Sequence, residues 1–419
     1  MSRADVVLSI YDDLGNPHYG GGGAVVVARI AARLARDHRV TVYAGSYRGS
    51  RSQLRDGVRY VFLPVGWAGP RAGQLLFALL LPLVALVHRP GVWVESLTPP
   101  FSASLLPVVA RCPVVGLVQM LSGADMARRY RLPFPVVERW GLALYRHFVV
   151  LNETDGQAVR RANPRARVTL IPNGVDLPPV DPAGYGRGRY ALFLGRIEVQ
   201  QKGLDLLFDA LGPQPPLPVV VAGGGPPAQE ARLRELVRGA APDRVRLPGR
   251  VDGAVKEALL RDCAFLVVPS RYETFCLSAL EAMAHGKPVV HFDLPRLAWI
   301  GPGCGIAVPA FDVAALGAAL ARLAADEPLR ARLGRGARAR SADFGWDAAA
   351  ARYAGLVAGL LAGPAGQRRS RLRTAESRAR VSPDIRCTSD ARSRTAETTA
   401  ARSSGPIRGL GKICRRICS

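Results

Sequence analysis

The sequence is poor in cysteine and in long hydrophobic runs. Its seven cysteines in 419 residues include no Cys-x-x-Cys pair, so neither a disulfide framework nor a zinc site of the common spacing is expected. The longest apolar run, Leu75–Val87, is broken by Pro82 and is too short to span a bilayer. We expect a helix there, buried in the core or, alternatively, facing a membrane. No signal peptide is predicted, because Met1 leads directly into a strand-like run. These absences favour a cytoplasmic protein with reduced thiols.

Acidic residues are also scarce. The net charge is +24, of which the segment from Pro364 onwards carries +10. Such a chain suits anionic phosphates, an anionic membrane surface or nucleic acid. The basic segment from Pro364 onwards contains no aromatic residues, which counts against specific nucleic-acid binding. Residues 363–419 are rich in Arg, Ser, Thr and Ala without an apolar period, which predicts a basic disordered tail.

Short apolar runs alternate with helical patterns in two consecutive series, as in units that build parallel sheets. The first series of predicted strands is Val6–Tyr11, Arg39–Ala44, Val58–Leu63, Val92–Glu95, Val114–Gln119, Phe148–Leu151 and Val168–Pro172. The second is Tyr190–Leu194, Pro218–Ala222, Val245–Pro248, Ala264–Pro269 and Pro288–Phe292. A Pro- and Gly-rich linker begins at Asp176. The pattern predicts an α/β protein with two Rossmann-like, doubly wound domains that face a central cleft, where such sheets bind ligands.

The strongest chemical signal is a strand–loop–helix motif with two glutamates. Glu273 lies on the loop after a predicted strand, and Glu281 lies about one turn into the predicted helix Leu277–His285. A helix amino end is a seat for phosphate, and carboxylates accept hydrogen bonds from sugar hydroxyls. The motif suits a sugar nucleotide, although two exposed glutamates without a role would have the same spacing.

Two cations precede this motif. Arg196 follows the strand Tyr190–Leu194, and Lys202 precedes the predicted helix Gly203–Leu211. Two fixed cations can neutralise a diphosphate and stabilise it as a leaving group. The chain has only four lysines. The presence of one of them at position 202 indicates that this position requires a compact ammonium group. A solvated charged loop is the alternative. Earlier in the chain, a glycine run that includes Gly22 and Gly23 precedes the first helix and would let backbone approach a ligand.

Together these motifs resemble the retaining GT-B glycosyltransferases of family 4, the glycosyl transferases group 1. The glycine turn, Pro172-Asn-Gly-Val-Asp176, the Arg196…Lys202 loop and Glu273-x-Phe-x₅-Glu281 follow one another in the family's order. The resemblance implies a GT-B fold with an acceptor domain at 1–180 and a donor domain at 186–345. It also implies a helix at 346–362 that crosses back to the first domain.

The resemblance also implies a role for each site residue. Glu273, Arg196 and Lys202 would be catalytic, with the two cations on the donor diphosphate and Glu273 on the transferred sugar. Glu281 would bind the ribose hydroxyls. The remaining donor-binding residues would be Gly22, Gly23, Thr274, Phe275, Cys276 and Leu277.

The chain departs from the family pattern in three places. Many relatives have a histidine where this chain has Gln119, which can contact a sugar or acceptor but cannot shuttle a proton at neutral pH. Thr274 and Cys276 stand where the family often has glycines, although their backbone N–H groups can still serve. The Arg-rich tail has no counterpart in the pattern.

The expected function is transfer of a sugar from a nucleotide-diphosphate donor, UDP- or GDP-linked, to an acceptor hydroxyl on a glycan or lipid-linked glycan. No metal or other cofactor is expected. The protein would be cytoplasmic or peripheral at the inner membrane face, with an anionic membrane surface as a partner. The alternatives are another nucleotide-sugar reaction such as phosphorolysis, a non-catalytic nucleotide-sugar-binding protein and a basic nucleic-acid-binding protein.

Overall fold

The computed structural model describes residues 3–16, 22–98, 104–121, 134–181, 184–212, 214–240 and 242–363, with the single residues 123 and 127. The chain divides into a compact unit Met1–Leu361 and a second unit Ala362–Ser419. The fold below is that of the first unit, to which nearly all the described residues belong. The predicted basic tail, apart from its first residue Gly363, lies outside the described residues, as do Gly20 and Gly21 of the glycine run.

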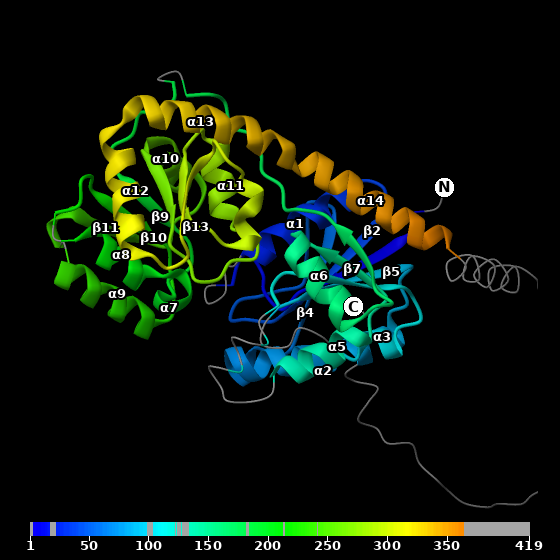
Figure 1. Ribbon diagram of the computed structural model, residues 1–419. Helices are drawn as coiled ribbons and strands as arrows, with labels where there is room; N and C mark the ends of the chain where they lie inside the picture. The colour runs from blue at the N-terminus through cyan, green and yellow to red at the C-terminus, as the bar shows by residue number, and fades with distance from the viewer. Residues whose placement is uncertain are drawn as a thin grey trace, which may run out of the picture. The chain divides into compact units, whose positions relative to one another are not determined.

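The first half of the chain forms one sheet (Figure 1). Its described strands lie in the order β3-β4-β2-β1-β5-β6-β7-β8, and all neighbours are parallel except β3 and β4. Their bounds are β1 Asp5–Ser9, β2 Arg39–Gly45, β3 Gln53–Arg55, β4 Val58–Leu63, β5 Val92–Leu97, β6 Val114–Val118, β7 His147–Val150 and β8 Arg167–Leu170. The predicted strands are present within two residues. The three-residue β3 was not predicted, because it is polar and lacks an apolar alternation.

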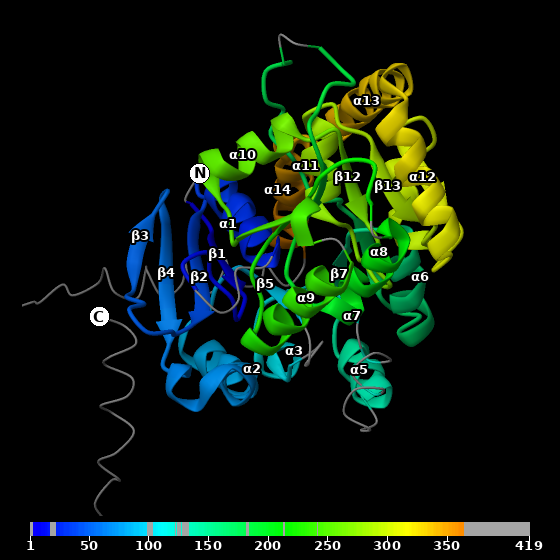
Figure 2. The same ribbon diagram turned by 90° about the vertical axis from the view of Figure 1, so that its left-hand side faces the viewer.

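Helices cover both faces of this sheet. Their bounds are α1 Gly22–Leu34, α2 Gly69–Val87, α3 Leu106–Val109, α5 Phe134–Ala143, α6 Glu153–Ala162 and α14 Trp346–Ala362, with a 3-10 turn η1 at Gly66–Ala68. The core on one face is built with α1 and α14, and the core on the other with α2, α3, α5 and α6. Figure 2 shows α2, α3 and α5 along one side of the sheet. Coverage on both faces explains why the strands read as nearly continuous apolar runs.

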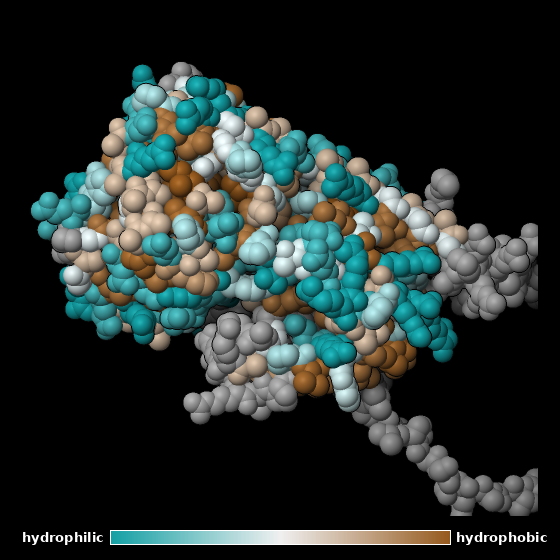
Figure 3. All heavy atoms as spheres, in the orientation of Figure 1, coloured by the Kyte–Doolittle hydropathy of each residue, from teal (hydrophilic) through white to brown (hydrophobic). Residues whose placement is uncertain are grey.

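The expectation that the Leu75–Val87 helix is buried is only half correct. Phe77, Leu81 and Val84 of α2 pack into the core, whereas Leu79 and Leu83 on the opposite side are exposed. Figure 3 shows hydrophobic surface along the edge where Figure 1 places α2, α3 and α5. No helix among the described residues is long and apolar enough to cross a membrane.

The second half forms a parallel sheet whose described strands lie in the order β11-β10-β9-β12-β13-β14. Their bounds are β9 Ala191–Leu194, β10 Val219–Ala222, β11 Val245–Gly249, β12 Phe265–Val268, β13 Val289–Phe292 and β14 Gly305–Val308. The helical segments are α7 Val199–Lys202, α8 Leu204–Leu211, α9 Pro227–Ala240, α10 Gly253–Asp262, α11 Leu277–Ala284, α12 Val313–Ala325 and α13 Glu327–Ser341, with short 3-10 segments η2 Pro242–Arg244, η3 Pro295–Ile300 and η4 Ala342–Phe344. One face carries α8, α9 and α12, and the other carries α10 and α11. Strand β14 was not predicted.

The last helix, α14, returns to the first sheet. Its buried residues Trp346, Tyr353 and Val357 belong to the core cluster that contains α1 and strands β1, β2, β5 and β6. The chain between β8 and β9 has no helix or strand among its described residues, apart from a bridge that joins Val175 to Gly345. The two sheets agree with the predicted fold class, while the predicted domain limits stay a prediction.

Candidate functional site

The site residues of the second half gather at one edge of its sheet. Strands β9 and β12 are parallel neighbours, so the loops that follow them leave the sheet on the same side. The loop after β9 carries Arg196 and leads into the short helix α7, whose last residue is Lys202, and the loop after β12 carries Ser270 and Glu273. The observed topology is therefore consistent with the prediction that these residues lie close together.

Lys202 and Glu273 form a direct ion pair. The Nζ atom of Lys202 lies 2.6 Å from Oε1 of Glu273, and the Ser270 hydroxyl donates to the same oxygen at 2.7 Å. The side chains of Lys202 and Glu273 are only 17% and 8% exposed. Because charge-assisted hydrogen bonds strengthen when water is largely excluded, this carboxylate is firmly oriented.

A glycine makes this approach of the two loops feasible. Gly203 has a left-handed backbone with φ 62°, and a Cβ atom there would lie 1.8 Å from the carbonyl oxygen of Pro269. Only glycine can occupy such a position. The Lys-Gly pair thus allows Lys202 to reach the end of β12.

Arg196 reaches the same edge but has a different partner. Its guanidinium is exposed and donates to Oε1 of Gln201 at 3.0 Å. The backbone N–H of Gln201 donates to Glu198, which caps α7. The structure therefore brings Lys202, but not Arg196, into contact with Glu273.

The predicted loop Thr274–Leu277 leads into α11. Cys276 occupies the helix N-cap position in the left-handed region, with φ 64° and ψ 77°, and its side chain makes no capping hydrogen bond. Phe275 stacks on Trp299 with ring centroids 4.6 Å apart, and the Trp299 indole donates to the Phe275 carbonyl. The Thr274 carbonyl accepts from Asn152 at 2.9 Å. These contacts fix the position of the loop. The first backbone N–H groups of α11 have no side-chain cap.

Glu281 lies on α11 as predicted, but its partner was not foreseen. Its Oε1 atom lies 2.9 Å from Nζ of Lys256 on α10. Both side chains are partly exposed, at 26% and 28%. Glu281 is thus held in place while it keeps access to solvent.

Residues of the first half lie beside the start of α11. A Cβ atom on Gly22 would lie 2.8 Å from Cδ1 of Leu277, and one on Gly23 would lie 3.7 Å from Cδ of Gln119. The Nε2 atom of Gln119 is buried and has no hydrogen-bond partner among the described residues. The predicted glycines, Gln119 and Leu277 therefore come together at the amino end of α1.

Sequence reasoning missed a second glycine loop at this edge. Gly223, Gly224 and Gly225 follow β10, which is the other neighbour of β9. A Cβ atom on Gly223 would lie 1.7 Å from the Gly195 carbonyl oxygen, so this loop packs directly against the Arg196 loop. The signal was available, since a glycine triplet between a strand and a helix matches the pattern already recognised at Gly22. Lys256 carried no such signal, because its partner Glu281 lies on another helix. Ser270 lies on the same loop as its partner Glu273, but its hydroxyl was not singled out in the sequence.

The thiol of Cys276 is not a nucleophile in this setting. Burial, followed by the nearby Glu273 carboxylate, raises the pKa of Cys276 to about 12. A thiol with such a pKa stays protonated at neutral pH. In the described part of the chain, no group of three or more His, Cys, Asp or Glu side chains is arranged to hold a metal ion.

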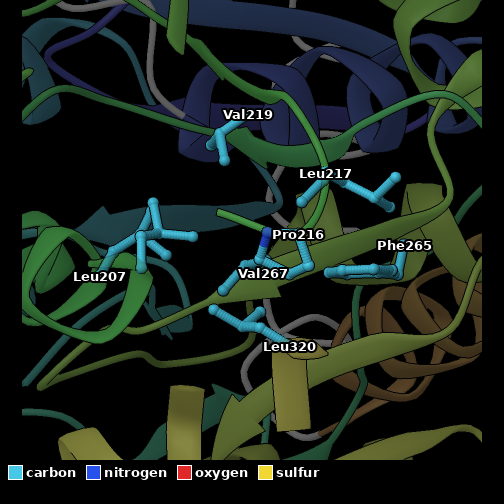
Figure 4. A pocket seen from close by; sticks show the side chains of 9 residues that line it. Leu207, Pro216, Leu217, Val219, Phe265, Val267 and Leu320 are labelled. Carbon is cyan, nitrogen blue, oxygen red and sulfur yellow. The ribbon is translucent and has the colours of Figure 1, made fainter. Parts of the chain in front are cut away.

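A small cavity in the second sheet's core is not part of this site. It is lined by apolar side chains of the sheet and of the helices that cover it, among them Leu207, Phe265 and Leu320 (Figure 4). No charged or polar side chain lines it, so it offers nothing to hold a phosphate.

Two family models match consecutive parts of the chain. The model described as glycosyltransferase family 4 matches residues 20–178, and the one described as glycosyl transferases group 1 matches residues 188–326. The first match contains Gly22, Gly23 and Gln119, and the second contains the Lys202–Glu273 pair.

Curated relatives match over part of their length. A D-inositol 3-phosphate glycosyltransferase from Xylanimonas cellulosilytica is 35% identical over 207 residues, which are 44% of this chain and 49% of that protein. A phosphatidyl-myo-inositol mannosyltransferase from Mycobacterium leprae is 36% identical over 174 residues, which are 39% of this chain and 46% of that protein. The chain thus spans about half the length of the curated relatives it matches.

Solved structures agree with the observed fold. A sucrose-phosphate synthase from Thermosynechococcus elongatus superimposes with a TM-score of 0.74 at 22% identity, covering 86% of this chain and all of the other. At this identity the likeness concerns the fold alone, and that fold is the two-sheet GT-B architecture.

Proposed function

Because the chain belongs to glycosyltransferase family 4, within the glycosyl transferases group 1, we propose that it transfers a sugar from a nucleotide-diphosphate donor to an acceptor hydroxyl. The observation that carries the proposal is the buried Lys202–Glu273 pair beside the uncapped amino end of α11. A cation and a helix amino end suit a diphosphate, and an oriented carboxylate suits the hydroxyls of a sugar.

In this proposal each site residue has one task. Lys202 and Arg196 bind the donor diphosphate, with Arg196 turning from Gln201 towards it. Glu273, oriented by Ser270, contacts the transferred sugar, and Glu281, oriented by Lys256, binds the ribose. Gly22 and Gly23 let the backbone of α1 approach the donor, and Gln119 uses its unpartnered amide on a sugar or acceptor hydroxyl.

The proposed reaction retains the anomeric configuration through a front-face displacement. The bond from the acceptor oxygen to the anomeric carbon forms while the bond from that carbon to the phosphate oxygen breaks. The acceptor proton passes to the departing phosphate oxygen, and Lys202 and Arg196 stabilise the charge that develops there. In this mechanism no side chain has to shuttle the proton. It therefore does not require a histidine at position 119, where this chain has glutamine.

The acceptor is proposed to be a glycan or a lipid-linked glycan, and the protein is proposed to act at the cytoplasmic face of a membrane. The relative from Mycobacterium leprae is named for a phospholipid acceptor, phosphatidyl-myo-inositol. The net charge of +24 favours attraction to an anionic surface. The donor nucleotide is proposed to be UDP or GDP.

The test is nucleotide release by the purified protein over a panel of UDP-, GDP- and ADP-sugars. Release from one donor should fall about 10²- to 10³-fold in Lys202→Ala, because one charge-stabilising group is removed. Release should be abolished in Glu273→Ala. Lys202→Arg, which keeps the charge, is the matched control and should retain more activity than Lys202→Ala.

Two other results would change the conclusion. Full turnover in Lys202→Ala would remove this lysine from the mechanism. Tight nucleotide-sugar binding without release from any donor would instead support the alternative of a non-catalytic nucleotide-sugar-binding protein.

A further inference from the structure

Helix α2 is apolar on its outer side as well as on its inner side. Leu75, Leu79, Leu83 and Leu86 repeat at helical spacing, and the last three are 53–57% exposed. In a water-facing helix this stripe would normally be polar. No described part of the chain covers these leucines.

Two neighbouring segments present similar side chains. On α5, Val136, Val137 and Trp140 form an exposed stripe, with Trp140 75% exposed. Just before α2, Trp67 of η1 is 81% exposed. Tryptophan is the residue that favours the boundary between water and lipid, since its ring is apolar and its N–H is polar.

All these stripes face the same side of the molecule. The inner residues of α2, α3 and α5 pack into a single core cluster on one face of the first sheet, so their outer sides point away from that face. Both ribbon views place the three helices on this side, and Figure 3 shows hydrophobic atoms there. We call these outer stripes, with Trp67, the α2–α5 surface.

The charged side chains on and next to these helices are mostly arginines. Exposed Arg89, Arg111, Arg139 and Arg146 lie on or next to its helices. In the described parts of 66–89, 104–121 and 134–146 the one acidic residue is Glu138, whose carboxylate accepts a hydrogen bond from the Gly123 backbone. An apolar stripe with a basic border complements an anionic lipid surface.

We propose that the α2–α5 surface docks this protein on a bilayer that carries anionic lipid, with α2 and α5 lying in the plane of the interface. Leucine and tryptophan side chains enter the boundary of the acyl chains, and the arginines contact lipid phosphates. A second copy of the chain fits less well, because it would bring two basic borders together. The inference deepens the proposed function and rests on it in one respect, that a lipid-borne acceptor is reached from this surface.

The test is co-sedimentation of the full-length protein with vesicles of phosphatidylcholine alone or with about 30 mol% phosphatidylglycerol, a mimic of an anionic leaflet. The variant is Leu79→Gln/Leu83→Gln/Leu86→Gln. Its binding to the anionic vesicles should fall about tenfold or more, since interfacial binding scales with buried apolar area. The matched control is Leu54→Gln/Val180→Gln/Leu247→Gln, which removes three exposed apolar side chains elsewhere and should bind like the parent.

Both variants keep the Arg-rich tail, so attraction of the tail to lipid cancels in the comparison. Unfolding midpoints equal to the parent's are required of both, and Trp140→Gln tests the same surface through α5 if the triple variant does not fold. Equal vesicle binding by parent, variant and control would overturn the proposal. The proposal would also be overturned if the parent protein bound no vesicles. It would be overturned again if the triple leucine variant differed from the parent in oligomeric mass but not in vesicle binding.

Nucleotide release in solution separates this proposal from the proposed function. The triple variant should release nucleotide at the parent's rate, because the three leucines lie on the exposed side of α2 and none of them is assigned to the donor. If the protein bound vesicles but released nucleotide from no donor, the proposed transferase function would be rejected and the proposed docking on lipid would be retained.

Discussion

At the scale of single residues, Cys276 is the position where the backbone conformation opposes the side chain. Its φ of 64° lies in the left-handed region, where a Cβ atom costs about 1–2 kcal/mol relative to glycine. Glycine, which the family resemblance leads one to expect at this position, would adopt this conformation without that cost. The loop keeps the conformation because Phe275 on one side is fixed by Trp299.

Cys276→Gly should therefore raise the free energy of unfolding by about 1 kcal/mol. Urea unfolding followed by fluorescence measures the change. Cys276→Ala is the matched control, since it removes the thiol and keeps the Cβ atom, and it should show no such gain. Equal stability of the glycine and alanine variants would mean that the backbone relaxes at this position.

At the scale of elements, β5 carries a carboxyl group into the core of the first sheet. Glu95 is buried and accepts a hydrogen bond of 2.7 Å from Tyr145, whose hydroxyl in turn accepts from the Ser104 backbone. Burial raises the pKa of Glu95 to about 7, although hydrogen bonds from the side chains of Tyr145 and Ser104 act in the opposite direction. The folded protein thus holds this proton more tightly than the unfolded chain does.

The sign of the pH dependence follows from this difference. Above pH 4.5 the unfolded chain loses the proton first, so ionisation favours unfolding. The contribution of Glu95 to stability is present below about pH 4.5 and is lost as the pH rises through the folded-state pKa of about 7. By pH 8 the loss amounts to roughly 3 kcal/mol.

Glu95→Gln should remove this part of the pH dependence. Because other groups also titrate, the measurement is the difference in unfolding free energy between variant and parent at pH 5 and at pH 8. The difference should move in favour of the variant by roughly 2–3 kcal/mol between the two values. A difference that stays constant with pH would show that Glu95 titrates alike in the folded and unfolded chain.

At the scale of the whole first unit, α14 connects the end of the fold to its beginning. Trp346 at the start of α14 packs on Gly174, where a Cβ atom would lie 2.6 Å from the indole ring. The Val175 N–H donates to the Phe344 carbonyl at 2.7 Å. The Pro172–Asp176 turn is thus shaped to receive the chain on its return to the first sheet.

Trp346→Ala should lower the free energy of unfolding by about 3–5 kcal/mol, because it leaves a cavity between α14, the turn and the first sheet. Chemical unfolding of the full-length protein measures the loss. Arg352→Ala, an exposed residue of the same helix, should change the stability by less than about 0.5 kcal/mol. A Trp346 variant as stable as the control would mean that α14 lies outside the cooperative core.

The sequence by itself determined the class of fold and the residue types of the site. Strands such as Val114–Val118 and Phe265–Val268 are apolar on both sides, so any arrangement that buries them needs helices on both faces. Lys202 and Glu281 were identified because each lies at a fixed offset from a strand or helix end, and such offsets are local properties of the chain.

The tertiary structure alone decided which side chains meet. Lys202 pairs with Glu273 across 71 residues and Glu281 with Lys256 across 25, while Arg196 turns to Gln201. It also decided that one face of α2 is buried and the other exposed, although both are apolar. The physical reason is the same in each case. Hydrophobic periodicity and the offset of a residue from a helix or strand end are local properties of the chain. The side chain that a residue contacts is set by the packing of elements that are distant in sequence, and no local pattern records it.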